Sequence, residues 1–403
     1  MVDSVLPMNV RHNFNILKQG DNCVLLEKMK TNDPSFSHIK LRFSHLCPVT
    51  ELKQVTECLK SNTTIKSLCL RHNDFNNQND KKSGERARVI ASLLENNHTI
   101  QELDLSLCDM DTNDLSCIII ALQYNKSVSK LHLSIFNAEK SKVLSDFLTP
   151  CPKHALLLEI LNPLLGPEGA HKKSQELLPI NMTLTKLHLD IQCGVLKNIA
   201  DSLCNNTSIE ELHLDICICS GSEFLYVSHI LQNNSTLKNL HLSWNSWFDK
   251  HPDHVHMLGQ GLNKNSSVQI LHMKKVTLTG KDACTIVNAL ENNTNLVELS
   301  FCISNDMKEL MQALAKNMTL EKVELLCAEF DMKCLSVLMD WIIHRKKSVH
   351  VKIVYNEDDS DNEALVKKIR AEVEENGCTE CVDVRCSNDF LDSLGIFFQS
   401  TDK

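Results

Sequence analysis

Apolar residues recur along the chain with a period of about 28 residues. Each cycle contains an apolar–x–apolar step, such as Leu131 with Leu133 or Leu240 with Leu242, and this alternation is typical of a half-buried strand. Amphipathic stretches of helical length lie between these steps, for example GERARVIASLLENN from Gly84 to Asn97. The pattern predicts one strand and one helix per cycle. Neither element can bury its apolar face alone, so neighbouring cycles must stack into a solenoid.

The first apolar residue of each strand, which we call the anchor, fixes the phase of the cycle. Asparagine lies six residues before the anchor in ten of thirteen cycles, which gives the template L-x-x-N-x-x-[ILV]-x-x-L-x-L. An asparagine at this point either adopts the left-handed backbone conformation or caps backbone groups. The anchors are Ile39, Leu68, Leu103, Leu131, Leu158, Leu187, Leu212, Leu240, Leu271, Leu299, Val323, Val351 and Val382.

The template resembles that of the ribonuclease-inhibitor-like leucine-rich-repeat family, most clearly in NTSIEELHLDIC (Asn206 to Cys217) and NSTLKNLHLSWN (Asn234 to Asn245). The resemblance implies an α/β fold: a right-handed leucine-rich-repeat solenoid, or horseshoe, with a parallel β-sheet on the concave face and helices on the convex face. It points most to the C-terminal repeat region of NOD-like receptors. The family's Asn or Cys side chain that satisfies turn backbone falls here at Asn73, Cys108, Cys217 and Asn245.

Three segments are expected along the chain. Residues 36–385 hold about 12 to 13 repeats, residues 1–35 form an N-terminal cap, and residues 386–403 form a C-terminal cap. The cycle around Leu158 has Pro152 at the asparagine position, so we expect an irregular repeat there. The last three cycles lose the leucine-rich strand and are expected to be degenerate.

Composition excludes several classes of function. The formal net charge of -9 and the pI near 6.1 argue against a binder of nucleic-acid phosphates. Eighteen scattered cysteines fit reduced thiols, and no apolar run suits a signal peptide or a membrane span. We therefore expect a cytoplasmic protein with no membrane and no nucleic-acid partner. No phosphate-binding loop or catalytic constellation is visible, so we predict no enzyme activity and no cofactor.

Histidine and cysteine spacings do not match a familiar metal site. The run from His251 to His256 has no cysteine nearby, and Cys378, Cys381 and Cys386 supply three ligands at most. We predict no metal. Eight of the phased asparagines also read N-x-[ST], and because the turn sets their phase, we interpret them as structural rather than as glycosylation acceptors.

One position on the strands suggests a binding surface. The residue between the two strand leucines is histidine in four successive cycles, and side chains at equivalent positions of a parallel sheet stack about 4.8 Å apart. Two aspartates lie two residues further on, and two tryptophans, a residue type enriched at binding hot spots, follow one strand. The competing interpretation is passive duplication of L-H-L and packing of the tryptophans. The predicted partner-binding residues are His188, Asp190, His213, Asp215, His241, Trp244, Trp247 and His272.

We therefore predict a non-catalytic protein–protein interaction scaffold that binds a protein partner on its concave face, in sensing or regulation of the NOD-like-receptor type. One alternative is a GTPase-activating protein of the Ran-activator type, which has repeats of this length and an acidic tail; here the acidic stretch is the short loop from Glu357 to Glu363. A second alternative is a ribonuclease inhibitor, whose regular alternation of repeat lengths this chain lacks. The sequence does not identify the partner or the oligomeric state.

Overall fold

The computed structural model describes residues 12–16, 22–43, 49–70, 84–108, 110–149, 183–192, 194–217, 223–244, 252–291, 293–303, 307–327, 350–355, 367, 371, 374–375 and 382–386. The chain divides into two compact units. The first unit comprises Met1–Asp190 with Asn206–Ile209, and the second comprises Ile191–Asn205 with Glu210–Lys403. Each unit is described by itself.

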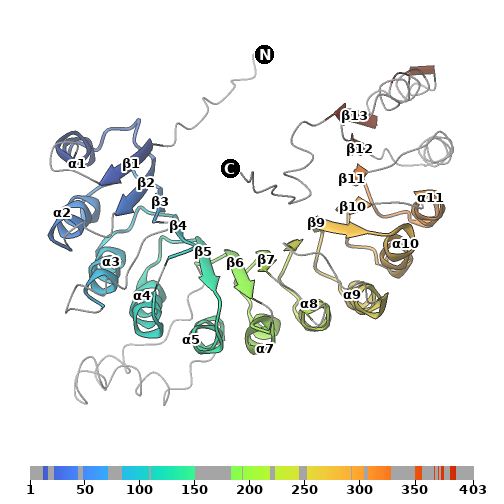
Figure 1. Cartoon of the computed structure of the whole chain (residues 1–403), viewed down its shortest axis with the longest axis horizontal. Coiled ribbons are helices and arrows are strands. Elements are labelled where there is room, and N and C mark those ends of the chain that lie inside the picture. The colour runs from blue at the N-terminus through green and yellow to red at the C-terminus, as the bar shows by residue number, and fades with distance from the viewer. Residues whose placement is uncertain are drawn as a thin grey trace, which may run out of the picture. The chain divides into compact units, whose positions relative to one another are not determined.

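The first unit alternates strands and helices along the chain, and its helices lie on one side of its sheet (Figure 1). Strands β1 to β5 pair in parallel in chain order, and β6 is the next strand of the sheet. The strands are β1 (His12–Ile16), β2 (His38–Phe43), β3 (Ser67–Cys69), β4 (Glu102–Leu105), β5 (Lys130–Ile135) and β6 (Lys186–Gln192), and the helices are α1 (Asn22–Lys30), α2 (Val49–Lys60), α3 (Glu85–Asn96), α4 (Thr112–Tyr124) and α5 (Ala138–Leu148).

The second unit repeats the same arrangement. All of its described strand pairs are parallel and follow chain order. The strands are β7 (Glu211–Cys217), β8 (Asn239–Trp244), β9 (Ile270–Leu278), β10 (Glu298–Ile303), β11 (Lys322–Cys327), β12 (His350–Tyr355) and β13 (Val382–Cys386), and the helices are α7 (Leu196–Asn205), α8 (Glu223–Asn233), α9 (Pro252–Lys264), α10 (Gly280–Ala289) and α11 (Met307–Lys316).

The register of the strands follows the phase of the sequence. In the first unit Ile39, Leu68, Leu103 and Leu131 pair in one continuous row. In the second unit the row runs through Leu212, Leu240, Leu271, Leu299, Val323, Val351 and Val382. The anchors from Leu212 to Val323 are buried, as are the described anchors of the first unit. The α/β leucine-rich-repeat solenoid is therefore confirmed, because one spacing rule sets both the core and the pairing.

The phased asparagines tie each repeat to the one before it. Asn125 accepts hydrogen bonds on Oδ1 from the backbone N–H groups of Ser127 (2.9 Å) and Val128 (2.8 Å), and its Nδ2 donates to the carbonyl of Leu94 (2.7 Å) in the preceding repeat. Asn97 has φ −95° and ψ 130°, an extended conformation. The capping interpretation of the asparagine is thus confirmed, and the left-handed one is wrong at this position.

The same bond to the preceding repeat recurs at every phased asparagine that the structure describes. The amide nitrogens donate to main-chain carbonyls, and the residues are buried. These asparagines therefore have the structural role that was predicted from the sequence. These asparagines are Asn62, Asn97, Asn125, Asn206, Asn234, Asn265, Asn293 and Asn317.

The structure corrects the prediction that a strand at Leu158 lies next to the strand at Leu131. Strand β6 follows β5 directly in the sheet, and the carbonyl of Ser129 accepts hydrogen bonds from the backbone N–H groups of Thr185 and Lys186, both at 3.0 Å. No strand from the cycle at Leu158 therefore lies between β5 and β6, although the cycle itself falls outside the described residues. The missing asparagine alone does not explain this outcome, because β2 and β12 pair in the sheet although their cycles have Asp33 and Arg345 at that position.

The sequence also led to predictions about the last three cycles, the turn residues and the two caps. The last three cycles keep their strands, β11 to β13, because valine anchors suit a strand as well as leucine does. The thiol of Cys108 donates to the carbonyl of Leu70 at 2.9 Å, as the resemblance implied. The side chains of Asn73, Cys217 and Asn245 lie outside the described residues. Residues 1–35 contain β1 and α1, and both caps stay predictions.

Candidate functional site

The residues between the buried strand leucines lie on the side of each sheet away from its helices, which we call the open face. On β5, Leu131 and Leu133 are buried while His132 between them is partly exposed. The same alternation brings His188, His213, His241 and His272 to the open face. In each unit the imidazoles therefore lie on neighbouring strands, each one between two buried residues of its own strand.

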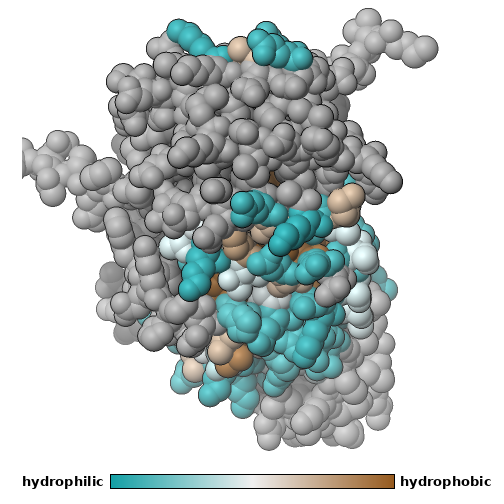
Figure 2. Space-filling view, turned by 90° about the vertical axis from the view of Figure 1, so that its right-hand side faces the viewer, coloured by the Kyte–Doolittle hydropathy of each residue, from teal (hydrophilic) through white to brown (hydrophobic). Residues whose placement is uncertain are grey.

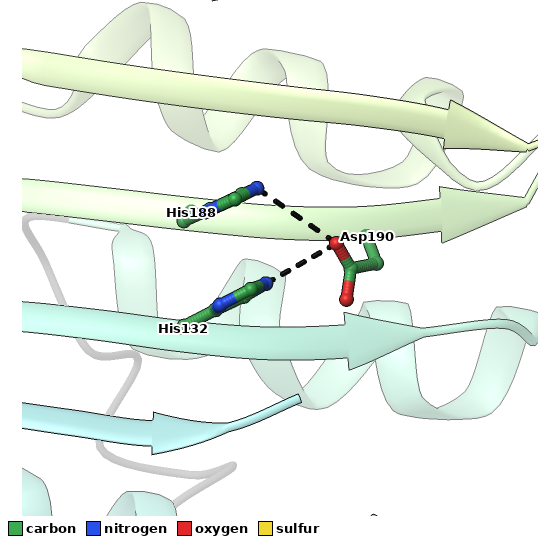
Figure 3. A group of neighbouring side chains, drawn as sticks. All are labelled: His132, His188 and Asp190. Atoms are coloured by element: carbon green, nitrogen blue, oxygen red, sulfur yellow. Dashed lines mark hydrogen bonds and ion pairs between the residues drawn. The ribbon is translucent and has the colours of Figure 1, made fainter. Parts of the chain in front are cut away.

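The first histidine group consists of His132, His188 and Asp190 in the first unit (Figure 3). The rings of His132 on β5 and His188 on β6 stack in parallel, with centroids 3.7 Å apart and planes 5° apart. Their Nε2 atoms lie 3.2 Å and 3.8 Å from Oδ1 of Asp190. Asp190 lies two residues after His188 on the same strand, so the pleat brings both side chains to one face.

A second layer of hydrogen bonds fixes the first histidine group. The hydroxyl of Ser134 donates to Oδ2 of Asp190 at 2.7 Å. On the other side, Nδ1 of His132 lies 3.4 Å from Oδ1 of Asp104. That oxygen also accepts from the backbone N–H (2.9 Å) and the hydroxyl (2.7 Å) of Ser106. Both carboxylates beside His132 are thus held by neighbouring groups.

The pKa of Asp190 reflects this surrounding. Burial favours the neutral acid and acts to raise the pKa, but the hydrogen bond and charge of His132, the hydroxyl of Ser134 and the charge of His188 outweigh burial. The net result is a pKa below the ordinary aspartate value. Asp190 therefore supplies a persistent negative charge at the centre of the group.

The second histidine group consists of Glu211, His213, His241 and His272 in the second unit. His213 on β7 stacks on His241 of β8, with centroids 3.9 Å apart and planes 6° apart. His241 meets His272 of β9 edge to face at 4.7 Å. Nε2 of His213 lies 2.9 Å from Oε1 of Glu211, two residues earlier on the same strand. Three neighbouring strands thus contribute to one continuous aromatic contact.

A carboxylate on β10 ends this second group. Oε1 of Glu298 lies 2.9 Å from Nε2 of His272 and 2.7 Å from Nζ of Lys322. Burial acts to raise the pKa of Glu298, but the hydrogen bonds and positive charges of Lys322 and His272 lower it further than burial raises it. The Glu298 carboxylate is therefore held in its charged form below the usual range of glutamate.

The sequence prediction brought together most of these residues but not all of them. His188 and Asp190 lie in one group, and His213, His241 and His272 lie in the other. Asp215 is partly exposed on β7 in register with Ser243. Trp244 ends β8 in register with Ile216, but its side chain, like all of Trp247, lies outside the described residues.

The prediction missed His132 and the carboxylates Asp104, Glu211 and Glu298. His132 has the same L-H-L step as the others, but the expected strand at Leu158 separated it from His188. A signal for Glu211 was present, because residues two apart on a strand share a face. Glu298 comes from a neighbouring strand, and its position depends on the register.

The described cysteines offer little nucleophilic chemistry. The seven cysteines whose side chains the structure describes are free thiols. Burial raises the pKa of Cys58 and Cys117, and burial together with the charge of Asp201 raises the pKa of Cys204 to about 11. A thiol with a raised pKa carries little thiolate at neutral pH. These three cysteines therefore have packing roles.

The described surface is mainly polar on the side of the molecule that Figure 2 shows. Figure 2 shows hydrophilic residues covering most of the described surface on one side of the molecule, with apolar residues between them. The large apolar side chains exposed among the described residues are few: Leu107, Phe136, Leu225 and Met318. In the part of the chain that the structure describes, no helix combines the length and apolar character needed to cross a bilayer.

Comparison with known proteins finds similarity to one curated protein and to solved repeat structures. No family model matches the chain. The mouse (Mus musculus) NACHT, LRR and PYD domains-containing protein 14 is 26% identical over 264 residues, which cover 62% of this chain and 25% of that protein. The match thus spans about a quarter of the length of this curated relative.

Two solved structures are more distant in sequence. The leucine-rich-repeat-containing protein LegL7 of Legionella pneumophila is 13% identical with a TM-score of 0.45, and the match covers 90% of this chain and 98% of LegL7. The yeast Rad7 and Elc1 complex gives 14% identity and a TM-score of 0.32, covering 75% of this chain and 74% of the matched chain. Both scores are below 0.5, so the fold assignment rests on the register and the asparagine bonds. With those features and its similarity to the mouse protein, the chain is a leucine-rich-repeat protein whose repeat region resembles that of a NOD-like receptor.

Proposed function

We propose that this chain is a non-catalytic scaffold that binds a protein partner through the open face of its strands. The observation that carries the proposal is the set of partly exposed histidines that lie between buried residues on neighbouring strands of each unit. Their rings are stacked and their nitrogens face carboxylates, so little side-chain entropy is left to lose when a partner binds. A rigid polar surface of this kind suits specific recognition of another protein.

The binding surface centres on the second histidine group. It combines aromatic area from three strands with the carboxylates Glu211 and Glu298, and Trp244 and Trp247 follow β8 in the sequence. Aromatic residues in such a setting are enriched at binding hot spots. The similarity to a NACHT, LRR and PYD protein supports a role of the same type, in sensing or regulation within the cytoplasm.

Photo-crosslinking from two sites tests which face binds. A photoreactive amino acid replaces Asn239, a half-exposed residue of β8, or Gln232, an exposed residue of α8. Both positions carry a neutral amide in adjacent elements of one unit, so they form a matched pair. Each protein is irradiated in a cytosolic extract, and the products are identified by mass spectrometry.

We expect a protein crosslinked from position 239 that is absent from the products of position 232. A protein captured only from position 232 contradicts the proposal, as does capture of none from position 239. Assays of GTP hydrolysis by a Ran-type GTPase and of pancreatic-type ribonuclease inhibition test the two alternatives.

A further inference from the structure

Three atoms that commonly bind metal ions converge at the first histidine group. His132, His188 and Asp190 each offer one ligand atom, and all three atoms lie within 4.8 Å of one another. Nε2 of His132 is 3.2 Å and Nε2 of His188 is 3.8 Å from Oδ1 of Asp190. Ligand atoms around tetrahedral zinc are about 3.3 Å apart, because zinc bonds to nitrogen and oxygen are about 2.0 Å long. Small side-chain movements would therefore bring the three atoms to coordination distance.

His132 lies between two carboxylates, and this position favours a cation. Its Nδ1 faces Asp104 at 3.4 Å and its Nε2 faces Asp190 at 3.2 Å. A protonated imidazole donates from both ring nitrogens, whereas a neutral one donates from only one. In the neutral form, when Nδ1 donates to Asp104, Nε2 presents a lone pair to an oxygen of Asp190, and the two repel. A metal ion between these two atoms converts the repulsion into coordination.

We propose that His132, His188 and Asp190 bind a divalent transition-metal ion, and that zinc fits the site best. Two imidazoles with one carboxylate suit zinc, whereas magnesium and calcium prefer oxygen ligands. Three protein ligands leave a fourth position for water or an external ligand on the open face. This inference departs from the sequence expectation of no metal and does not depend on the proposed protein partner.

The surrounding hydrogen bonds match those that support bound metals. Ligating histidines usually donate their other ring nitrogen to a carboxylate or carbonyl, which orients the ring. Asp104 has this place beside Nδ1 of His132, and Ser106 holds it through two hydrogen bonds. Ser134 fixes Oδ2 of Asp190 and leaves Oδ1 directed at the histidines. The site thus has an outer layer as well as three ligands.

Binding must alter the stack of the two rings. Their planes differ by 5° and both Nε2 atoms face Oδ1 of Asp190, so the two Nε2 atoms point in nearly the same direction. A shared ion requires the rings to tilt until both lone pairs aim at it. Metal binding should therefore change the environments of both imidazoles together, which gives a readout that nonspecific surface binding lacks.

Zinc titration of the full chain tests the site. The protein is freed of metal with a chelator and titrated with zinc against a chromogenic zinc indicator, and the imidazole C–H signals of His132 and His188 are followed by NMR. Asp190→Asn removes the anionic ligand at nearly constant volume and should abolish the high-affinity equivalent. Asp104→Asn alters only the outer layer and should weaken zinc binding roughly 10- to 100-fold.

Two matched controls complete the experiment. His229→Ala removes an exposed histidine that lies 3.0 Å from Asp201, and Glu211→Gln removes the carboxylate of the second histidine group. Both variants should retain the high-affinity equivalent. Circular dichroism checks that each variant folds. If Asp190→Asn does not fold, the zinc-induced NMR shifts of His132 and His188 in the wild type still test the proposal. The proposal is overturned if the wild type binds zinc no more tightly than Asp190→Asn, or if zinc leaves the signals of His132 and His188 unchanged.

Discussion

The two histidine groups occupy the same strand position but have different carboxylate partners. In the first group Asp190 follows its histidine by two residues and contacts rings from two strands. In the second group Glu211 precedes its histidine by two residues, and His272 turns instead to Glu298 on the next strand. The repeat therefore determines where the imidazoles lie, and the carboxylates on the same and neighbouring strands determine what they contact.

This difference separates two chemical tendencies. Carboxylate and imidazole atoms of the first group converge on one point, an arrangement suited to a cation. In the second group Glu211, His213 and His241 also place three such atoms within 4.8 Å of one another, but the group continues to His272 and to Glu298, which contacts Lys322. Its aromatic edges and charges therefore extend over a wider surface, which suits a partner protein.

The largest effect is expected from a charge placed beneath the second group. Leu240 is buried in the row of anchors next to His241, and Leu240→Lys leaves an uncompensated charge in the core. We expect a loss of several kcal/mol in unfolding free energy, spread to adjacent repeats. Urea denaturation measures it. Lys238→Ala, at an exposed ion pair with Glu210, is the control and should cost less than about 1 kcal/mol. Equal urea midpoints for the wild type and Leu240→Lys would mean that the buried and exposed sides of this strand are assigned the wrong way round.

A smaller loss is expected when one bond between repeats is removed. Asn234→Ala deletes the bond from Nδ2 to the carbonyl of Leu203 and leaves the backbone N–H of Leu237 without its acceptor. Orphaned buried groups cost about 1–3 kcal/mol. Asn233→Ala is the neighbouring control, because Asn233 is exposed and bonds only within its own helix region. If the two variants had the same midpoint of thermal unfolding, the asparagine side chains would not stabilise the contact between neighbouring repeats.

A pH-dependent effect should appear at the edge of the second group. The folded pKa of Glu298 is lowered from 4.5, so its contribution to stability is present above that value and is lost as pH falls through the lowered pKa. Urea midpoints of the wild type and Glu298→Gln should differ at about pH 5.5 and converge in more acidic buffer. A gap that persists unchanged to pH 3 would assign the effect to packing rather than to charge.

The smallest effect concerns a strained residue beside the first group. Leu107 has a φ of 53°, and its backbone N–H donates to Ser134 at 2.8 Å. Asparagine tolerates this conformation better than leucine, and Leu107 is 37% exposed, so Leu107→Asn should raise stability by about 1 kcal/mol or less. Phe136→Asn, at a similarly exposed residue, should bring no gain. A melting temperature lowered by Leu107→Asn would mean that the leucine side chain packs usefully.

The fold could be predicted from the sequence because one rule is repeated many times. Anchors at Leu212 and Leu240 pair in the register that the phase required, and each asparagine makes the same bonds. The strand predicted at Leu158 was wrong because an apolar run does not by itself determine that a segment joins the sheet. The step from Leu131 to Leu187 therefore passes directly from β5 to β6.

The candidate site was less predictable because contacts between strands depend on register. The imidazoles of His213 and His241 follow from the repeat, but the contact between His272 and Glu298 requires knowledge of the neighbouring strand. The group around His132 depends on a neighbour 56 residues away in sequence, and no fixed spacing reveals it. Local periodicity thus predicts the surface, and strand adjacency determines its chemistry.

The most direct test is the affinity of the partner obtained by crosslinking from position 239, measured by calorimetry at pH 7.4 in the presence of a chelator. We compare the wild type, a triple variant with His213, His241 and His272 changed to glutamine, and His229→Gln. The open-face account predicts binding at least about tenfold weaker for the triple variant, or 1.4 kcal/mol, and wild-type affinity for His229→Gln. Wild-type affinity in the triple variant would contradict it.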